Sequence, residues 1–159
     1  MKLYIQQKVF SWRDQFAVKD EYGYDQFFAR GEIFTWGRKL HIYNAAGAEV
    51  AFLHRQLFRL LSRYTIEIGG YSYEMVKEFT LLKPRFRIEN LPWRMEGDFF
   101  AHEYDLLEGN RLVMHISKHW FTWGDSYELD IPNPGDQLMA LCVALTVDCM
   151  MADAASSSS

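Results

Sequence analysis

The chain has 159 residues, a length that fits one domain with a sizeable hydrophobic core. Its net charge of −4 argues against a general nucleic-acid-binding protein, because such a protein needs a basic face to meet phosphates, and we expect no nucleic-acid partner. Hydrophobic residues make up 49% of the chain, and the high aromatic share of 16% favours strands.

Short runs of alternating polarity, bounded by turn residues, follow one another from the N-terminus to Pro132. They predict strands at residues 3–10, 15–19, 27–34, 39–43, 49–53, 64–68, 71–79, 85–88, 93–95, 99–107, 111–120 and 126–131. His54–Ser62 is ambiguous because three of its leucines have helical spacing, and we interpret it as a long strand with its turn. Gly69-Gly70 and Glu96-Gly97-Asp98 predict hairpin turns. The total is about eleven or twelve strands.

A short aromatic sequence occurs twice, as Phe34-Thr35-Trp36-Gly37 and as Phe121-Thr122-Trp123-Gly124. Each copy ends a predicted strand and leads into a turn. We interpret the aromatic pairs as side chains that close strand ends by packing over the core. A duplicated half-barrel is the alternative, and two short matches do not establish it.

The chain after Pro132 has a different pattern. From Leu138 to Val147 every residue except Thr146 is apolar, so a helix here has no polar stripe and must be covered on all sides. We place this helix at residues 134–151 with Asp136 as its N-cap. Residues 1–152 then form a single domain, and residues 153–159 form a flexible, serine-rich tail.

The helix sequence also bears on location. A transmembrane helix needs about 20 apolar residues, whereas the apolar stretch Leu138–Met151 is shorter and contains Asp148, so we expect a core helix and no transmembrane span. Cys142 and Cys149 lie too far apart along a helix for a disulfide and are expected to be reduced and buried. Because the N-terminus also lacks a continuous apolar run, we expect a cytoplasmic protein.

The strand count and the apolar helix are geometrically compatible. Eight strands close into a barrel of about 8 Å radius and twelve into one of about 12 Å, while a helix packed against a surrounding wall needs about 10 Å. We therefore predict a mainly β fold, a closed barrel of about twelve strands enclosing a central hydrophobic C-terminal helix. A ligand must then bind at a rim or on the outside.

Motifs for catalysis, cofactors and metals are missing from the sequence. There is no Gly-x-Gly-x-x-Gly, phosphate-binding loop, Gly-x-Ser-x-Gly or His-Glu-x-x-His pattern, so we expect no catalytic residues and no cofactor. His115 and His119 lie about 13 Å apart on a strand, too far for one ion, and we expect no metal site. Asp148 is expected to reach the barrel mouth or to accept hydrogen bonds from a strand-end residue.

Basic residues offer the only candidate ligand site. Two groups could meet an anionic headgroup or phosphate: Lys83, Arg85 and Arg87, which alternate along a predicted strand, and Arg55, Arg59 and Arg63, which recur every four residues. The first group is our candidate anion- or lipid-binding site. The alternative is a solvated strand face balanced by Glu78 and Glu89.

Several stretches share their spacing with a known family. They are Lys2–Ile5, Phe10–Trp12, Gly31–Gly37, Leu40–Tyr43, Glu49–Phe52, Glu96–Phe99, Trp123–Leu129 and the final apolar helix. In this spacing, residues 1–152 resemble the LURP-one-related (YxjI-like) proteins. The resemblance implies the tubby C-terminal-like fold, a closed twelve-stranded barrel threaded by a C-terminal helix. The wider superfamily includes phosphoinositide-binding tubby domains and phospholipid scramblases, although no motif here carries their binding residues over.

These observations leave three functional hypotheses. The first is a non-catalytic binding or regulatory module whose barrel surface or mouth binds an anionic lipid, a small anion or a protein partner. The second is an enzyme with an unrecognised site at the barrel mouth, and the third is a scramblase-like, membrane-associated protein. The empty motif search disfavours the second, and the short apolar helix disfavours the third.

Overall fold

A computed structural model of the chain describes residues 1–6, 15–32, 36–121 and 124–157. It contains twelve strands, a short 3-10 helix and one α-helix, in the order β1 (Lys2–Gln6), β2 (Gln15–Asp20), β3 (Asp25–Gly31), β4 (Lys39–Asn44), β5 (Glu49–Arg55), β6 (Arg63–Ile68), β7 (Tyr71–Glu78), β8 (Arg85–Glu89), β9 (Trp93–Asp98), β10 (Glu103–Glu108), β11 (Arg111–Phe121), β12 (Gly124–Asp130), η2 (Pro134–Asp136) and α1 (Gln137–Ser157). The aromatic repeat includes residues 33–35 and 122–123, which lie outside the described residues.

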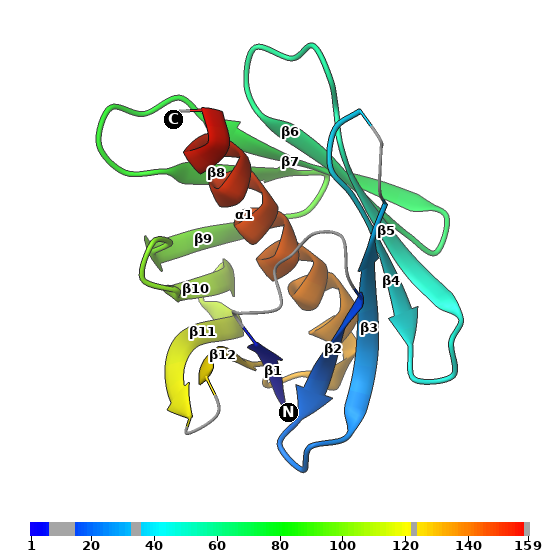
Figure 1. The fold of residues 1–159 in the computed structure, drawn as a ribbon. Coiled ribbons are helices and arrows are strands. Elements are labelled where there is room, and N and C mark those ends of the chain that lie inside the picture. Colours follow the sequence, from blue (N-terminus) through cyan, green and yellow to red (C-terminus); the bar gives the residue numbers. More distant parts are fainter. Residues whose placement is uncertain (7–14, 33–35, 122–123, 158–159) are drawn as a thin grey trace.

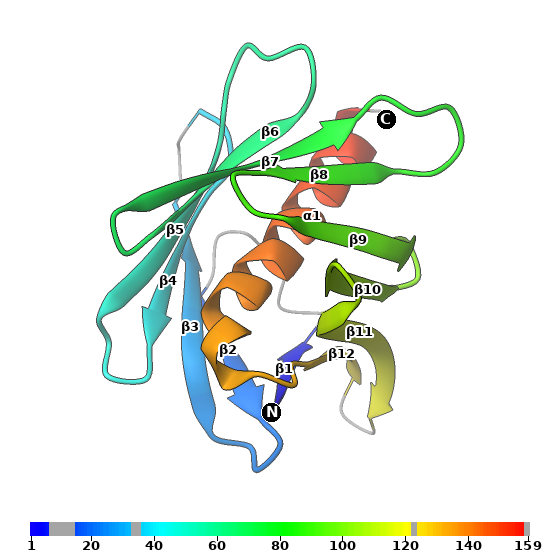
Figure 2. The same cartoon turned by 180° about the vertical axis from the view of Figure 1, so that it is seen from behind.

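The strands form one antiparallel sheet that curls into a nearly closed barrel (Figure 1). The order is β8-β7-β6-β5-β4-β3-β2-β1-β12-β11-β10-β9, and the terminal strand β12 pairs with β1. The two end strands, β8 and β9, lie side by side without being hydrogen-bonded neighbours in this order (Figure 2). The rings of Phe86 and Phe99 meet beside this seam, edge to face, with centroids 4.9 Å apart. The predicted barrel is confirmed, with this one incomplete closure.

The helix α1 occupies the interior of the barrel, as predicted (Figures 1 and 2). All residues from Ala140 to Val147 are buried, and so are Cys149 and Met150. The strands supply the covering side chains from alternate positions: Leu3, Ile5, Val18, Leu40, Ile42, Leu53, Ile66, Met75, Leu106, Met114, Ile116 and Leu129. The one polar residue in the apolar run, Thr146, donates its hydroxyl hydrogen to the carbonyl oxygen of Cys142 at 2.7 Å, so no polar atom of that side chain is left unsatisfied.

The helix is longer than predicted. It continues to Ser157, so residues 153–157, expected in a flexible tail, belong to the helix, and residues 158–159 lie outside the described part. Alanines favour the helix here, and Asp153 is held by partners on the strands. By length and composition, the stretch Pro134–Ser157 is apolar enough to cross a membrane, with a mean hydropathy of 1.8 and 56% of the window buried in this fold. The length of the helix therefore does not distinguish a core helix from a transmembrane helix. Its burial inside the sheet is that of a core helix.

The helix start also differs in detail. Asp136 belongs to the preceding 3-10 turn, where the side chain of Asn133 accepts a hydrogen bond of 3.1 Å from the Gly135 amide. The Asp136 carboxylate accepts a hydrogen bond from Arg111 at 2.6 Å. Asn133 therefore caps this turn, and Asp136 ties the helix start to β11.

Two strand predictions are wrong. The ambiguous segment is not a long strand, because β5 ends at Arg55 and residues 56–62 form a loop before β6. The predicted turn at Glu96-Gly97-Asp98 is the end of β9, and the turn comes at residues 99–102. Gly97 faces Tyr104 on β10, where an added Cβ would lie 2.5 Å from the Glu103 carbonyl oxygen. This glycine serves a close approach of two strands rather than a turn.

Because the strands are antiparallel, successive loops lie alternately at the two ends of the barrel. Residues 36–38 before β4, the β5–β6 loop (residues 56–62) and the β7–β8 loop (residues 79–84) lie at the end where α1 finishes, at the top of Figure 1. The amide of Lys77, near the end of β7, donates to the carbonyl oxygen of Ser62 in the β5–β6 loop at 2.9 Å. The β2–β3 and β4–β5 turns and the N-terminus lie at the opposite end.

Candidate functional site

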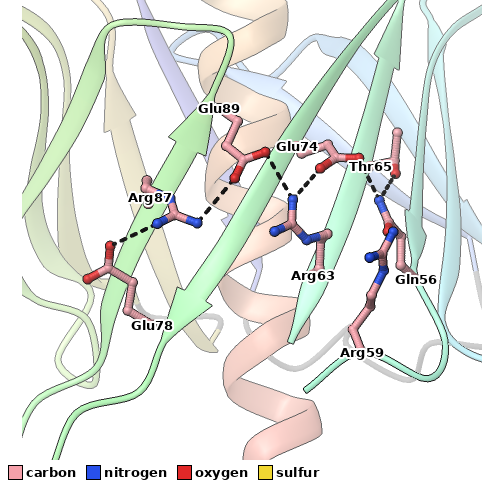
Figure 3. A network of polar contacts seen from close by, with 8 residues as sticks. All are labelled: Gln56, Arg59, Arg63, Thr65, Glu74, Glu78, Arg87 and Glu89. Atoms are coloured by element: carbon pink, nitrogen blue, oxygen red, sulfur yellow. Dashed lines mark hydrogen bonds and ion pairs between the residues drawn. The ribbon is translucent and has the colours of Figure 1, made fainter. Parts of the chain in front are cut away.

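The outer face of β6, β7 and β8 carries a chain of alternating charges (Figure 3). Arg87 contacts Glu89 at 3.1 Å and Glu78 at 3.8 Å. Glu89 also contacts Arg63 at 3.0 Å, and Arg63 forms a further ion pair with Glu74. Two of the six basic candidates from the sequence, Arg87 and Arg63, are therefore already paired with carboxylates of neighbouring strands.

This network continues into the β5–β6 loop. The amide nitrogen of Gln56 donates hydrogen bonds of 2.9 Å to both Thr65 and Glu74, and its oxygen accepts one of 3.0 Å from Arg59. The hydrogen bond from Gln56, followed by the contacts with Arg63, lowers the pKa of the Glu74 carboxyl despite some desolvation by burial. Glu74 is therefore a fixed anion that holds the base of the loop in place.

Three of the six candidates have no carboxylate partner in the described part of the chain. Lys83, Arg85 and Arg59 form no ion pair among the residues that the structure describes. Lys83 and Arg85 are exposed at the start of β8, on the side opposite the buried Phe86. The structure thus divides the predicted site: Lys83 and Arg85 remain available to an anion, Arg87 is occupied, and Arg59, from the second group, joins the available cations.

The end of α1 is joined to the same part of the barrel. The Asp153 carboxylate accepts a 2.9 Å hydrogen bond from Nε of Arg38 and another from the Tyr64 hydroxyl, and Arg55 approaches it to 3.8 Å. Burial, with the negative charges nearby, raises the pKa of the Tyr64 hydroxyl far above its ordinary value, so it stays protonated and donates. Arg55 and Arg38 share Asp153, and this cluster fixes the helix end against β4, β5 and β6.

Exposed apolar side chains lie at the same end of the barrel, where the sequence pattern does not predict them. Phe58 and Leu60 on the β5–β6 loop are fully exposed, and Leu81 and Leu82 on the β7–β8 loop are 89% and 93% exposed. We call the whole set the apolar rim, which comprises Trp36, Leu57, Phe58, Leu60, Phe79, Leu81 and Leu82. One feature of the sequence could have indicated the exposed loop: the run from Phe79 to Leu82 interrupts the alternation of a strand just before Pro84.

A second polar cluster lies deeper, around Asp148. Its carboxylate accepts a hydrogen bond from the Tyr127 hydroxyl and lies 3.2 Å from Nε2 of His102, whose ring stacks on Tyr127 with centroids 4.8 Å apart. Burial and the Asp148 charge raise the pKa of the Tyr127 and Tyr104 hydroxyls well above the ordinary value. Asp148 thus accepts a hydrogen bond from a strand residue, as expected, although Tyr127 lies in the middle of β12 rather than at a strand end. The cluster explains how a carboxylate is tolerated on the apolar helix.

The remaining titratable groups give weaker candidates. His115 contacts Asp105 at 2.6 Å and Glu103 at 3.9 Å, and the His119 side chain lies outside the described part. Among the described residues, no three histidine, cysteine or acidic side chains are grouped so as to hold a metal ion. An open cavity of about 410 Å³ on β4–β6 is lined by His41 and Glu49, which contact each other.

We call the end of the barrel with the apolar rim, Lys83 and Arg85 the helix-end rim, and the chemistry available there is that of binding. Two exposed cations can approach a phosphate or carboxylate without breaking an ion pair, and arginine can engage an oxyanion with two parallel hydrogen bonds. Cys142 and Cys149 offer no nucleophile to solvent, since both are fully buried and burial raises the pKa of each thiol.

Comparison with known proteins identifies the family. The family model described as LURP-one-related matches residues 1–148. The uncharacterized protein YxjI of Bacillus subtilis is 34% identical over 152 residues, which cover 95% of this chain and 94% of that protein. The crystal structure of the Arabidopsis thaliana protein AT5G01750 superposes with a TM-score of 0.61 at 16% identity, over 92% of this chain and 89% of that one, and so supports the fold. The chain therefore belongs to the LURP-one-related family.

Proposed function

We propose that this protein is a non-catalytic binding module that holds the phosphate of an anionic phospholipid headgroup at Lys83 and Arg85. The observation that carries the proposal is the difference between these two cations and their neighbours. Arg87 and Arg63 are each contacted by two carboxylates. Lys83 and Arg85 are exposed without an ion pair to any described residue.

The surrounding charge supports an anionic ligand at this end. Residues 55–63 and 77–85 contain six basic residues and one acidic residue, a net charge of +5 within a chain of net charge −4. Arg55 and Arg63 are balanced by carboxylates outside these segments, Asp153, Glu74 and Glu89. The remaining cations, which include Lys83 and Arg85, still give a local positive potential that attracts an anionic surface, although the whole protein would be repelled by it. The interior offers no competing place for the ligand, because α1 fills it.

Enzymatic activity is the second hypothesis from the sequence, and its best candidate is weaker. His102 and Asp148 form the kind of pair that positions a general base, but the hydroxyl that Asp148 contacts belongs to the buried Tyr127. Tyr127 and His102 both stabilise the charge of the Asp148 carboxylate at the inner side of the barrel. We therefore place the function at the exposed cations.

Vesicle co-sedimentation tests the proposal. The intact protein is mixed with phosphatidylcholine vesicles that contain, or lack, phosphatidylglycerol, at several salt concentrations. We expect binding only to the anionic vesicles, weakening with salt. Each basic residue near an anionic surface is worth about 1 kcal/mol, so Lys83→Ala with Arg85→Ala should reduce binding about thirtyfold.

Matched controls give the experiment its specificity. Lys19→Ala with Arg94→Ala removes the same charge from exposed residues far from the β7–β8 loop, and binding should fall much less. Arg87→Ala alone should also have a small effect, because its charge is already balanced by Glu78 and Glu89. Equal losses in the two double variants, or no preference of the wild type for anionic vesicles, would show that the proposal is wrong.

A further inference from the structure

The apolar rim is unusual for a surface that faces only water. Phe58, Leu60, Leu81 and Leu82 are exposed on two loops at the end of the sheet, and none of them belongs to the buried core. Phe58 also has a φ of +59°, a conformation that bulky residues rarely adopt. Exposed apolar groups of this kind, bordered by polar residues, mark surfaces that contact a partner or a membrane.

The two loops leave the sheet at the same end of the barrel. The last residue of the β5–β6 loop, Ser62, accepts a hydrogen bond of 2.9 Å from the amide of Lys77, which lies on β7 two residues before the β7–β8 loop. The segment before β4, which carries Trp36, lies close to the β5–β6 loop. A Cβ added to Gly37 would lie only 3.0 Å from the Leu57 side chain. In Figure 1 both loops and the last turn of α1 stand at the top of the barrel. The rim therefore consists of three segments at the same end of the barrel.

The charges around the rim favour one kind of partner. The available cation Lys83 directly follows Leu82 in the chain, and Arg85 comes two residues later. Acidic residues stand at the opposite end, with Asp20, Glu21 and Asp25 around the β2–β3 turn. This polarity would orient the barrel with its apolar rim toward an anionic surface.

A second copy of this chain fits the rim less well. In a symmetric dimer the same patch faces itself, so the positive segments of one copy would meet those of the other and repel. A bilayer with anionic headgroups complements both features at once, because its phosphates meet the cations and its acyl boundary accepts protruding apolar side chains.

We propose that Phe58 and Leu60 on one loop, and Leu81 and Leu82 on the other, insert between the lipid headgroups of an anionic bilayer, with the barrel standing end-on. This inference rests on the proposed headgroup binding and adds to it the depth and the orientation of docking. The Lys83 and Arg85 side chains then lie at the level of the phosphates. The acidic β2–β3 turn points away from the membrane.

Environment-sensitive labels test the insertion directly. Both native cysteines are fully buried, so a thiol-reactive NBD dye reports from a cysteine introduced at Leu82→Cys or at Phe58→Cys. The control is Tyr22→Cys, on the exposed β2–β3 turn at the opposite end. With phosphatidylglycerol vesicles we expect a blue shift and a several-fold rise in emission from the two rim labels, and no change from the control.

The outcomes separate this inference from the proposed function. If the labelled protein sediments with anionic vesicles while the rim labels stay in water, the insertion is wrong and headgroup binding stands. If it does not sediment at all, both proposals are wrong. Leu81→Ser with Leu82→Ser should weaken vesicle binding about tenfold or more. Light scattering of the wild type without lipid should show a monomer, and a dimer that this double variant dissociates would assign the tips to a contact between copies.

Discussion

Nε of Arg38 donates a hydrogen bond of 2.9 Å to the carboxylate of Asp153, joining two residues that are 115 positions apart in the chain. Arg38 lies just before β4, and Asp153 lies in the part of α1 beyond the predicted helix end. The Asp153 side chain is only 10% exposed. The contact therefore anchors the last turns of the central helix at the rim where the candidate binding residues are.

Replacing Asp153 by alanine should destabilise the fold. The change leaves the Arg38 guanidinium and the buried Tyr64 hydroxyl without their shared acceptor, which typically costs about 2–4 kcal/mol in the free energy of unfolding. Urea denaturation followed by circular dichroism measures this loss. Glu96→Ala, which removes an exposed ion pair with Arg94, should cost less than about 1 kcal/mol. Similar values for both variants would contradict the anchoring role.

The burial of α1 makes a second prediction. Leu145 is fully buried inside the barrel, so Leu145→Ala should lower the free energy of unfolding by about 2–5 kcal/mol through lost contacts and a cavity. Leu145→Asp should abolish folding, because the carboxylate would have no partner there. Leu112→Ala on β11, where the side chain is partly exposed, should cost about 1 kcal/mol or less. A soluble, cooperatively folding Leu145→Asp variant would contradict the central position of the helix.

Gly97 allows a third test of the packing. Its φ of +137° suits only glycine, and an added Cβ would lie 2.5 Å from the Glu103 carbonyl oxygen and 2.6 Å from Cα of Tyr104. We expect Gly97→Ala to cost more than about 3 kcal/mol, because backbone atoms cannot move aside cheaply. Gly47→Ala in the β4–β5 turn meets no atom within 4 Å and should cost only about 1 kcal/mol of backbone strain. Thermal unfolding distinguishes the two.

The lowered pKa of Glu74 predicts a dependence of stability on acid. The folded state holds the carboxylate ionised below its ordinary range, so the unfolded chain binds the proton first as the pH falls. The stabilisation from Glu74 is complete above its ordinary pKa and is lost as the pH falls through the lower, folded-state value. Between about pH 5 and about pH 3, Glu74→Gln should therefore show a smaller drop in the free energy of unfolding than the wild type. Glu96→Gln serves as the charge-matched comparison, and equal slopes in wild type and Glu74→Gln would refute the linkage.

Much of the fold could be predicted because its signals are local. The run from Leu138 to Val147 is apolar on every side, and Gly69-Gly70 marks a tight hairpin, with φ values of +56° and +82° in the structure. The wrong predictions concern residues whose local sequence pattern is explained by contacts with distant parts of the chain. Gly97 is required by the approach of Tyr104 rather than by a turn, and α1 extends past Met151 because Arg38 and Tyr64 hold Asp153.

The candidate site could be predicted only in part. Alternation correctly placed Arg85 and Arg87 on the outer side of β8, opposite Phe86 and Ile88. It could not show that Arg87 is occupied, because the pairing with Glu78 and Glu89 depends on how the side chains lie across the β7–β8 register.

The apolar rim could not be predicted for a similar reason. Spacing alone does not distinguish a leucine that points into a core from one that points away from it. Leu60 has the helical spacing of a buried residue in the sequence and is fully exposed in the structure, because β5 ends at Arg55 and the chain leaves the sheet.

Hydrogen exchange of the intact protein, with and without phosphatidylglycerol vesicles, tests the central claim that the helix-end rim docks on an anionic membrane. We predict slower exchange on vesicle binding in residues 56–62 and 79–85, and unchanged exchange in the β2–β3 and β4–β5 turns at the opposite end. Phosphatidylcholine vesicles should change neither region. Protection at the β2–β3 and β4–β5 turns, or no protection anywhere at a lipid concentration that sediments the protein, would contradict the account.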